Sequence, residues 1–140
     1  TKTNQVCVTL SENSQNIKYL HKFLEDESVR KEGACRIIKG EETMKLIFHE
    51  IELDKFEKLV GKQTIESVET GLSEIDIYLG KEAWGCKGLV ARIANEIANH
   101  DVNISEVISV LPELLFFVKS KDLINAHQAV FSLVSGKKAA

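Results

Sequence analysis

The chain has 140 residues, of which 44% are hydrophobic and 28% are charged, and its formal net charge is −3. This composition is typical of a globular protein with one ordinary domain or two small ones, and it argues against a disordered chain. Positive charges are spread along the sequence, which gives no indication of a nucleic-acid partner, and no apolar run approaches the ~20 residues that span a bilayer.

The chain opens with a predicted strand and a predicted helix. Apolar side chains alternate with Cys7 and Thr9, which predicts a strand over 5–10. A polar stretch with capping residues follows, and apolar side chains then recur at helical spacing, which predicts a helix over 14–26. The apolar positions behind these two predictions are Val6, Val8, Leu10, Ile17, Leu20, Phe23 and Leu24.

A hairpin, a helix and a third strand complete the first half. Two strand candidates, 34–39 and 43–50, are joined by a Gly-Glu-Glu turn, which predicts an antiparallel hairpin. A helical stripe over 53–60 follows, and Gly61 is expected to end that helix. The segment 62–70 is again typical of a strand.

The second half repeats this order of elements. Alternation predicts a strand over 73–80, and an apolar face at helical spacing predicts a helix over 88–99. Strands are expected over 102–110 and 113–119, with a Leu-Pro turn between them, because proline cannot serve a central ladder. A last helix is expected to begin at Asp122.

The repeat predicts the fold. Corresponding elements of the two halves stand about 70 residues apart in the sequence. We therefore predict a duplicated ferredoxin-like α+β fold, βαββαβ, with antiparallel sheets and the helices on one face. The predicted domains are residues 1–70 and 71–140.

The second predicted domain lacks an obvious final strand, because residues 135–138 are typical of a tail. In this fold the fourth strand pairs with the first at a sheet edge, and an open edge promotes aggregation. The segment 62–70 could fold back as a hairpin onto 73–80 and serve both sheets as a shared middle strand. The alternative is two separate domains, with the missing strand supplied by a partner chain.

The turn at residues 81–88 gives the clearest indication of a ligand. Glycines let the backbone approach a ligand closely, and the first turn of the next helix offers unpaired amides and a positive dipole end. A carboxylate fits there, and Asn103 could accept a hydrogen bond from the ammonium group of an amino acid. The alternative is that the glycines only make a tight turn and that the side chain of Asn103 forms hydrogen bonds with the local backbone.

The stretch GCKGLVARIANEIANHDVNISEV, residues 85–107, resembles the ACT domain, a small regulatory module that binds amino acids. Gly88 matches a glycine at the start of the family's first helix, and Asn103-Ile104 matches the Asn-Ile or Asn-Val pair that opens its second strand. The pattern LVARIANEIA also resembles the ACT domains of aspartokinases, as does the later register of Asp122, Ala126 and Val130.

The resemblance implies a ligand site between the first turn and the second strand, at an interface between two domains. The residues it implicates in ligand binding are Trp84, Gly85, Cys86, Lys87, Gly88, Asn103, Ile104 and Ser105. In the first half the equivalent turn has no glycine, and Asn13 and Ser14 are expected to cap the helix instead. We therefore expect the second domain to bind the ligand and the first to serve structure or pairing.

We predict no catalytic residue, no metal site and no cofactor. The four histidines have no metal-ligand spacing, and the sequence contains no nucleotide-binding loop, kinase signature or hydrolase elbow. The three widely spaced cysteines fit neither a disulfide framework nor a zinc ribbon, and the amino terminus is not a signal peptide, so a cytoplasmic location is expected. Because the chain begins at Thr1 and not at Met, we expect a processed chain or a fragment of a longer protein.

The leading functional hypothesis is an amino-acid-sensing regulatory module without enzymatic activity. It would bind a small ligand at a domain or subunit interface, form a homo-oligomer, most simply a dimer, and control a metabolic enzyme on another domain or subunit. The alternative is an assembly module of the same fold that binds no small molecule. Nucleic-acid binding is disfavoured, because the central strands lack the exposed aromatic pairs and basic residues of RNA-binding sheets, and no membrane partner is expected.

Overall fold

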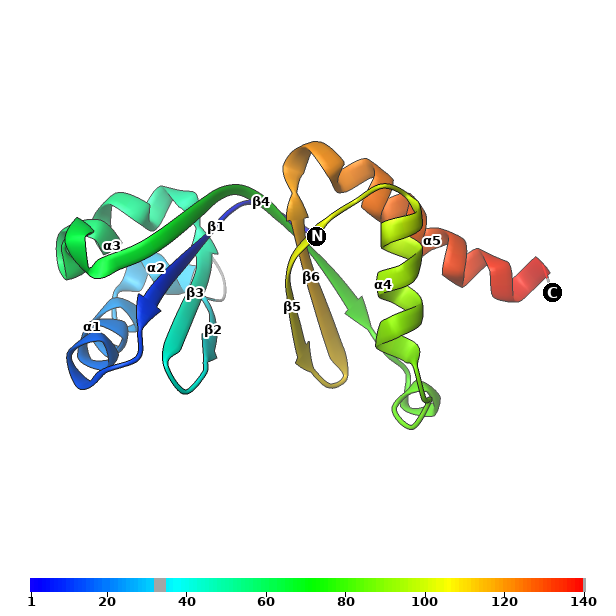
Figure 1. The fold of residues 1–140 in the computed structure, drawn as a ribbon, viewed down its shortest axis with the longest axis horizontal. Helices are drawn as coiled ribbons and strands as arrows, with labels where there is room; N and C mark the ends of the chain where they lie inside the picture. The colour runs from blue at the N-terminus through cyan, green and yellow to red at the C-terminus, as the bar shows by residue number, and fades with distance from the viewer. Residues whose placement is uncertain (32–34, 140) are drawn as a thin grey trace. The chain divides into compact units, whose positions relative to one another are not determined.

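The computed structural model describes the backbone of residues 1–31 and 35–139 and the side chains as far as residue 134 (Figure 1). Six strands follow the order β2-β3-β1-β4-β6-β5, in which neighbours are hydrogen-bonded. The strands pair antiparallel. The predicted class, a duplicated ferredoxin-like α+β fold, is confirmed.

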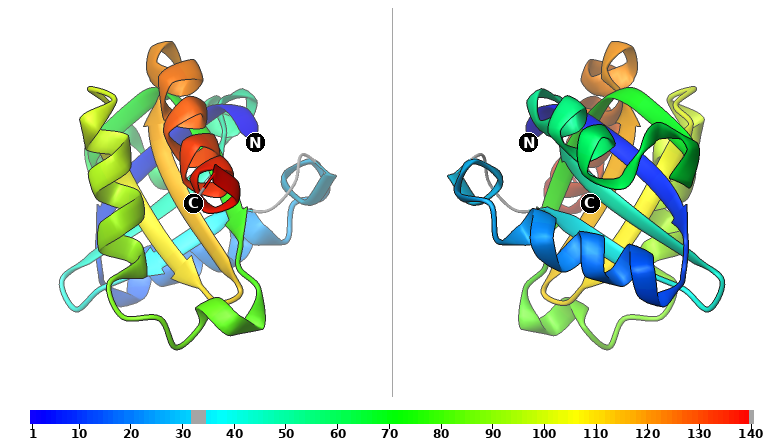
Figure 2. Two further views of the ribbon diagram at one scale, coloured as in Figure 1. Left: turned by 90° about the vertical axis from the view of Figure 1, so that its right-hand side faces the viewer. Right: turned by 90° about the vertical axis from the view of Figure 1, so that its left-hand side faces the viewer.

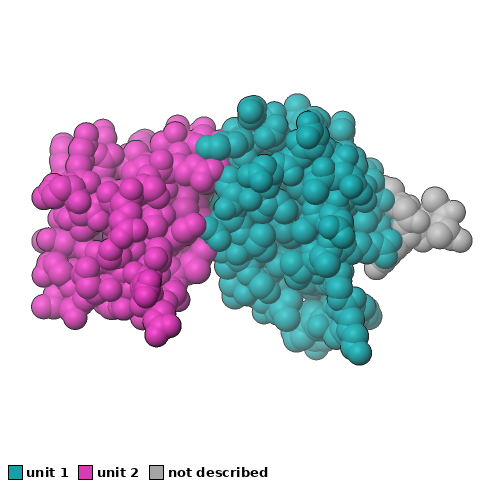
Figure 3. All heavy atoms as spheres, in the orientation of Figure 1, with its two compact units in different colours: residues 1–2, 73–140 teal, residues 3–72 magenta. Residues whose placement is uncertain are grey.

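The chain divides into two compact units (Figure 3). Residues 3–72 form the N-terminal unit, and residues 1–2 together with 73–140 form the C-terminal unit. The first two residues are held in the C-terminal unit by a 2.7 Å hydrogen bond between the hydroxyl of Thr1 and Nε2 of His127.

The N-terminal unit contains a βαββαβ order of elements with two extra helical turns and one extra short helix. The elements are β1 (Lys2–Ser11), α1 (Ser14–Leu24), α2 (Glu27–Lys31), β2 (Arg36–Lys39), β3 (Thr43–His49), η1 (Glu50–Glu52), α3 (Leu53–Val60), η2 (Lys62–Thr64) and the first part of β4 (Ile65–Tyr78).

The core of the N-terminal unit lies between one face of its strands and the helices α1 and α3. Alternate side chains of a strand point to the same face, so Val6 of β1 and its partner Phe48 of β3 both enter this core. Three rings, one from each of α1, β3 and α3, lie 4.9–5.4 Å apart at their centroids: Phe23, Phe48 and Phe56.

The C-terminal unit uses the second part of β4 as its first strand. The elements that follow are η3 (Lys81–Ala83), α4 (Leu89–Asn99), β5 (Ile104–Val110), β6 (Glu113–Lys119), η4 (Ser120–Asp122) and α5 (Leu123–Ala139). The two helices α4 and α5 contact each other and one face of the strands (Figure 2). Their shared core contains Ile75, Ile93, Ile97, Val102, Leu114, Phe116, Val118, Ala126 and Ala129.

The hairpin predicted between 62–70 and 73–80 is wrong. Both segments belong to one continuous strand, β4, so they cannot pair with each other. Gly71 has a φ of +67° but does not reverse the chain, and Leu72 at the predicted turn is fully buried. A large apolar side chain at the tip of a hairpin would be exposed, and its burial favours the extended strand. In the strand order β4 lies between β1 and β6, so the shared middle strand expected between the first strand and 73–80 does not form.

Most other elements agree with the sequence predictions. The β2–β3 hairpin forms as predicted, although residue 34 lies outside the described residues. The helix predicted over 14–26 ends at Leu24, because Asp26 accepts a hydrogen bond from the Ser28 amide and starts the unpredicted helix α2. The tail predicted at 135–138 is wrong, since α5 continues through it, and one glycine in a helix costs only about 0.5–1 kcal/mol.

A polar network joins the start of α2 to α3. Oδ1 of Asp26 accepts hydrogen bonds from the Ser28 amide at 2.9 Å, the Ser28 hydroxyl at 2.7 Å and Nζ of Lys55 at 3.1 Å. Lys55 also lies 3.5 Å from Oε2 of Glu52. The hydrogen bonds from Ser28 and then Lys55 lower the pKa of Asp26 from 3.8 to about 2, and those to Asp26 raise the pKa of Lys55.

We expect the free energy of unfolding to fall as the pH drops from about 4 to about 2 because of Asp26. Its pKa is lower in the folded state, so its stabilisation is fully present above the unfolded pKa of 3.8 and is lost as the pH falls through about 2. Asp26→Asn should remove this part of the pH dependence in urea unfolding, whereas Glu27→Gln, at an exposed neighbour, should retain it. An Asp26 carboxyl that titrates near 3.8 by NMR would contradict the network.

Candidate functional site

The first helix of the C-terminal unit, α4, begins without a side-chain cap. Gly88 at its N-cap has a left-handed backbone, with φ 76° and ψ 13°, and its carbonyl accepts a 2.9 Å hydrogen bond from the amide of Arg92. This conformation costs most other residues about 1–2 kcal/mol, which explains the glycine. The amides of the first turn have no acceptor within the helix, and they lie at the positive end of its dipole.

The equivalent helix of the N-terminal unit, α1, has a side-chain cap at its start. Oδ1 of Asn13 accepts a 2.8 Å hydrogen bond from the amide of Asn16, so the capping role predicted for Asn13 is confirmed. Ser14 is the first residue of the helix, and not its cap. The two units therefore differ at the same place in the fold, and the helix start without a side-chain cap belongs to the C-terminal unit.

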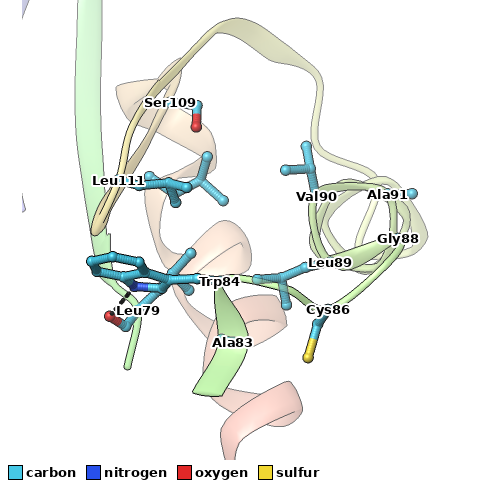
Figure 4. A pocket seen from close by; sticks show the side chains of 11 residues that line it. Leu79, Ala83, Trp84, Cys86, Gly88, Leu89, Val90, Ala91, Ser109 and Leu111 are labelled. Atoms are coloured by element: carbon cyan, nitrogen blue, oxygen red, sulfur yellow. Dashed lines mark hydrogen bonds between the residues drawn. The ribbon is translucent and has the colours of Figure 1, made fainter. Parts of the chain in front are cut away.

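A pocket of about 230 Å³ lies beside the start of α4 (Figure 4). Its walls come from the end of β4, the turn that follows, the first turn of α4 and the β5–β6 hairpin. The lining residues are Leu79, Ala83, Trp84, Cys86, Gly88, Leu89, Val90, Ala91, Ser109, Leu111 and Leu114.

Backbone and side-chain hydrogen bonds hold the walls of the pocket in place. The amide of Leu79 donates to the carbonyl of Pro112 at 2.8 Å, which joins the end of β4 to the β5–β6 hairpin. The indole Nε1 of Trp84 donates to the carbonyl of Leu79 at 3.4 Å, so the ring lies along one wall (Figure 4). Sγ of Cys86 donates to the carbonyl of Glu82 at 3.5 Å.

Three of the predicted ligand residues line this pocket together: Trp84, Cys86 and Gly88. Gly85 and Lys87 belong to the same exposed turn but do not line the pocket. A Cβ added at Gly85 would meet no atom within 4 Å, so open space surrounds this glycine.

The other three predicted residues, Asn103, Ile104 and Ser105, follow α4 in the chain, where the loop after the helix leads into β5. Gly88 precedes the 11 residues of the helix, which span about 16 Å, and Asn103 lies four residues after the end of the helix. Ile104 packs against the core, and the β5–β6 register shifts between Ile104 and Glu106. None of these three residues lines the pocket beside the start of α4.

Sequence reasoning missed the wall formed by the β5–β6 hairpin. Ser109, Leu111 and Leu114 carry no motif, and nothing in their residue types indicates a ligand. The signal that could have found them is topological. In the order β4-β6-β5, antiparallel pairing brings the carboxyl end of β4 and the β5–β6 turn to the same end of the strands.

The site contains no charged side chain among its lining residues. Among the residues that the structure describes, no group of three histidine, cysteine or carboxylate side chains could hold a metal ion. The three cysteines, all within the described residues, form no disulfide. Burial raises the pKa of Cys35 to about 12, whereas Cys86 is exposed at the pocket. No described helix has the length and apolar character needed to cross a membrane.

No protein-family model and no curated protein matches the chain. Solved structures do match it. The Clostridium acetobutylicum aspartate kinase has a TM-score of 0.73 and 17% identity, over 94% of this chain and 33% of that enzyme, so the chain spans about a third of the enzyme's length. The aspartate kinase from Synechocystis has a TM-score of 0.71 and 16% identity, over 96% of this chain and 26% of that one.

A separate regulatory subunit has the same architecture. The regulatory subunit of aspartate kinase from Thermus thermophilus, in a ligand-free form, has a TM-score of 0.68 and 10% identity, over 94% of this chain and 91% of that subunit. The chain therefore has an ACT-like fold, which confirms the resemblance found in the sequence. These identities are low, and the likeness is one of fold.

Proposed function

We propose that this protein is an amino-acid-responsive regulatory module that has no catalytic activity of its own. The observation that carries the proposal is the α4 start, which has no side-chain cap and opens onto a pocket, in a fold shared with a regulatory subunit of aspartate kinase. The module would control a metabolic enzyme carried by another domain or subunit, in the cytoplasm.

The carboxylate of the ligand would bind the amides at the start of α4. Those amides point their N–H groups out of the helix, and a negative charge beside them is stabilised by about 0.3–1 kcal/mol from the helix dipole. The hydroxyl of Ser109 lines the same pocket and can accept a hydrogen bond from the ligand's ammonium group. The arrangement suits a small molecule that carries both charges, as an α-amino acid does.

The residues at the start of β5 would contribute from a second copy of the chain. The 11 residues of α4, about 16 Å of helix, stand between Gly88 and the loop that carries Asn103, and Asn103, Ile104 and Ser105 do not line the pocket. In this proposal they contact the ligand from another domain, which a homodimer would supply. A ligand held by two bodies can shift the equilibrium between their arrangements, provided that it binds one arrangement more tightly.

The test is a thermal-shift panel of the twenty amino acids on wild type, Gly88→Asp and Gly85→Asp. Aspartate tolerates a left-handed backbone, and its carboxylate would occupy the α4 amides in place of the ligand. Both sites have open space for a Cβ, and both variants add one negative charge to the same turn. At a ligand concentration of 100 Kd, wild type should gain about 2.7 kcal/mol.

We expect the Gly88→Asp variant to lose this gain and Gly85→Asp to keep it. Equal responses of both variants would place the ligand elsewhere. The absence of any response in wild type would favour the second candidate function, a pure assembly module. One observation supports that candidate: β5 is an edge strand in the sheet order, and its Val107 and Val110 are exposed. Sedimentation of the wild type without ligand would then show a stable oligomer.

A further inference from the structure

The pocket beside α4 is bounded mainly by hydrocarbon. Leu79, Leu111 and Leu114 come from the end of β4 and from the β5–β6 hairpin. The indole of Trp84 lies along the same wall, close to Leu111 and Leu79 (Figure 4). Leu89 and Val90 of α4 form the opposite wall. A ligand side chain that enters between these walls would exchange water for apolar contacts, worth about 0.8 kcal/mol for each buried CH₂ group.

The polar groups of the lining offer little to a polar ligand side chain. Trp84 Nε1 already donates to the Leu79 carbonyl, and Cys86 Sγ donates to the carbonyl of Glu82. The remaining side-chain oxygen of the lining is the Ser109 hydroxyl. In the proposed pose this hydroxyl accepts a hydrogen bond from the ligand's ammonium group, so it is not free for a second polar group.

A charged ligand side chain would be penalised in this pocket. None of the 11 lining residues is acidic or basic. A lysine ammonium or an aspartate carboxylate would therefore lose part of its water without gaining an ion-pair partner from the lining, and burial of an unpaired charge is costly. The lining thus selects against both kinds of charged amino acid.

The size of the pocket favours a short side chain. Its volume of about 230 Å³ is below the roughly 300–1,000 Å³ of sites that hold drug-sized ligands. We infer that the pocket selects an α-amino acid with a short aliphatic side chain, of the valine and leucine class. This inference rests on the proposed function, because it assumes that the α4 start binds the carboxylate.

The first experiment compares ligands of equal shape. Trp84 is the single tryptophan of the chain, so fluorescence titration of the full-length protein reports directly on the pocket wall. L-valine and L-threonine differ by a methyl group and a hydroxyl, and an apolar pocket separates such a pair by up to about 100-fold. We expect valine to bind at least about 10-fold more tightly than threonine, and L-norleucine more tightly than L-lysine by a similar factor.

The second experiment changes the pocket. Leu111 lines the pocket but is 53% exposed, so Leu111→Asp should fold and place a carboxylate at the pocket mouth. The control is Val110→Asp, at a neighbour that is 55% exposed and does not line the pocket. We expect Leu111→Asp to weaken valine binding at least about 10-fold and to reverse the preference between norleucine and lysine. Val110→Asp should bind as wild type does.

The outcomes separate this inference from the proposed function. Tighter binding of threonine or lysine than of their aliphatic counterparts by the wild type would overturn the inference and leave an amino-acid sensor standing. Equal effects of Leu111→Asp and Val110→Asp would also overturn it, because the pocket wall would then not determine the selectivity. If none of these four amino acids changes the fluorescence or the melting temperature, the inference fails, and if none of the twenty amino acids does so, the proposed function fails as well.

Discussion

Phe56→Ala is expected to lower the free energy of unfolding by about 3–5 kcal/mol. Phe56 is fully buried in the N-terminal unit, and its ring contacts Phe23 at 5.0 Å and Phe48 at 5.4 Å between centroids. Truncation removes the ring contacts of α3 with α1 and β3 and leaves a cavity. Because a domain has only about 5–15 kcal/mol of stability, this loss threatens the whole unit. Urea unfolding followed by circular dichroism measures it.

The matched variant is Phe56→Leu, which keeps an apolar side chain at the same position. Nearly volume-conserving exchanges usually cost less than about 1.5 kcal/mol, so this variant should retain most of the stability. The midpoint should shift without a change in the slope m, because the folded and unfolded states keep their exposed areas. A loss below about 1 kcal/mol for Phe56→Ala would mean that the three rings do not form the centre of this core.

In the C-terminal unit, Phe116→Ala should cost a similar 3–5 kcal/mol. Phe116 on β6 is fully buried in the core beneath α4 and α5. Its neighbour in the fold, Leu114, belongs both to this core and to the pocket wall. The variant should therefore weaken ligand binding together with stability, and both can be followed in one thermal-shift experiment.

The control for this prediction is a phenylalanine in the same unit. Phe131 on α5 is 70% exposed, and Phe131→Ala should change the free energy of unfolding by less than about 0.5 kcal/mol. The two variants remove the same atoms from the same unit and differ in burial. Equal losses would show that burial in this core does not determine the stability of the unit.

The periodic spacing of apolar residues predicted the fold well, because those residues form both cores. Val6, Val8 and Leu10 alternate on β1, and all three enter the N-terminal core as expected. The prediction of a hairpin at Gly71-Leu72 was wrong, because turn-forming residues are only a local preference and the burial of Leu72 outweighs it. A glycine with a positive φ can sit inside a strand, and a single sequence does not distinguish that case from a turn.

The candidate site was predicted in part. The glycine-bearing turn identified Trp84, Cys86 and Gly88, because glycine and a helix start carry recognisable chemistry. Leucines such as Leu111 could not be distinguished in the sequence from ordinary packing residues, since their role depends on where the hairpin lies. The resemblance also named Asn103, Ile104 and Ser105, which follow α4 in the chain and do not line the pocket.

The placement of Thr1 has a consequence for engineering. Both chain ends belong to the unit that carries the pocket, and residues 3–72 occupy the position of a cassette inserted between residue 2 and residue 73. A fluorescent reporter fused at either end is therefore anchored to the pocket-bearing unit by a short tether. The two boundaries of the cassette fall inside β1 and β4, so an exchanged cassette would have to continue both strands.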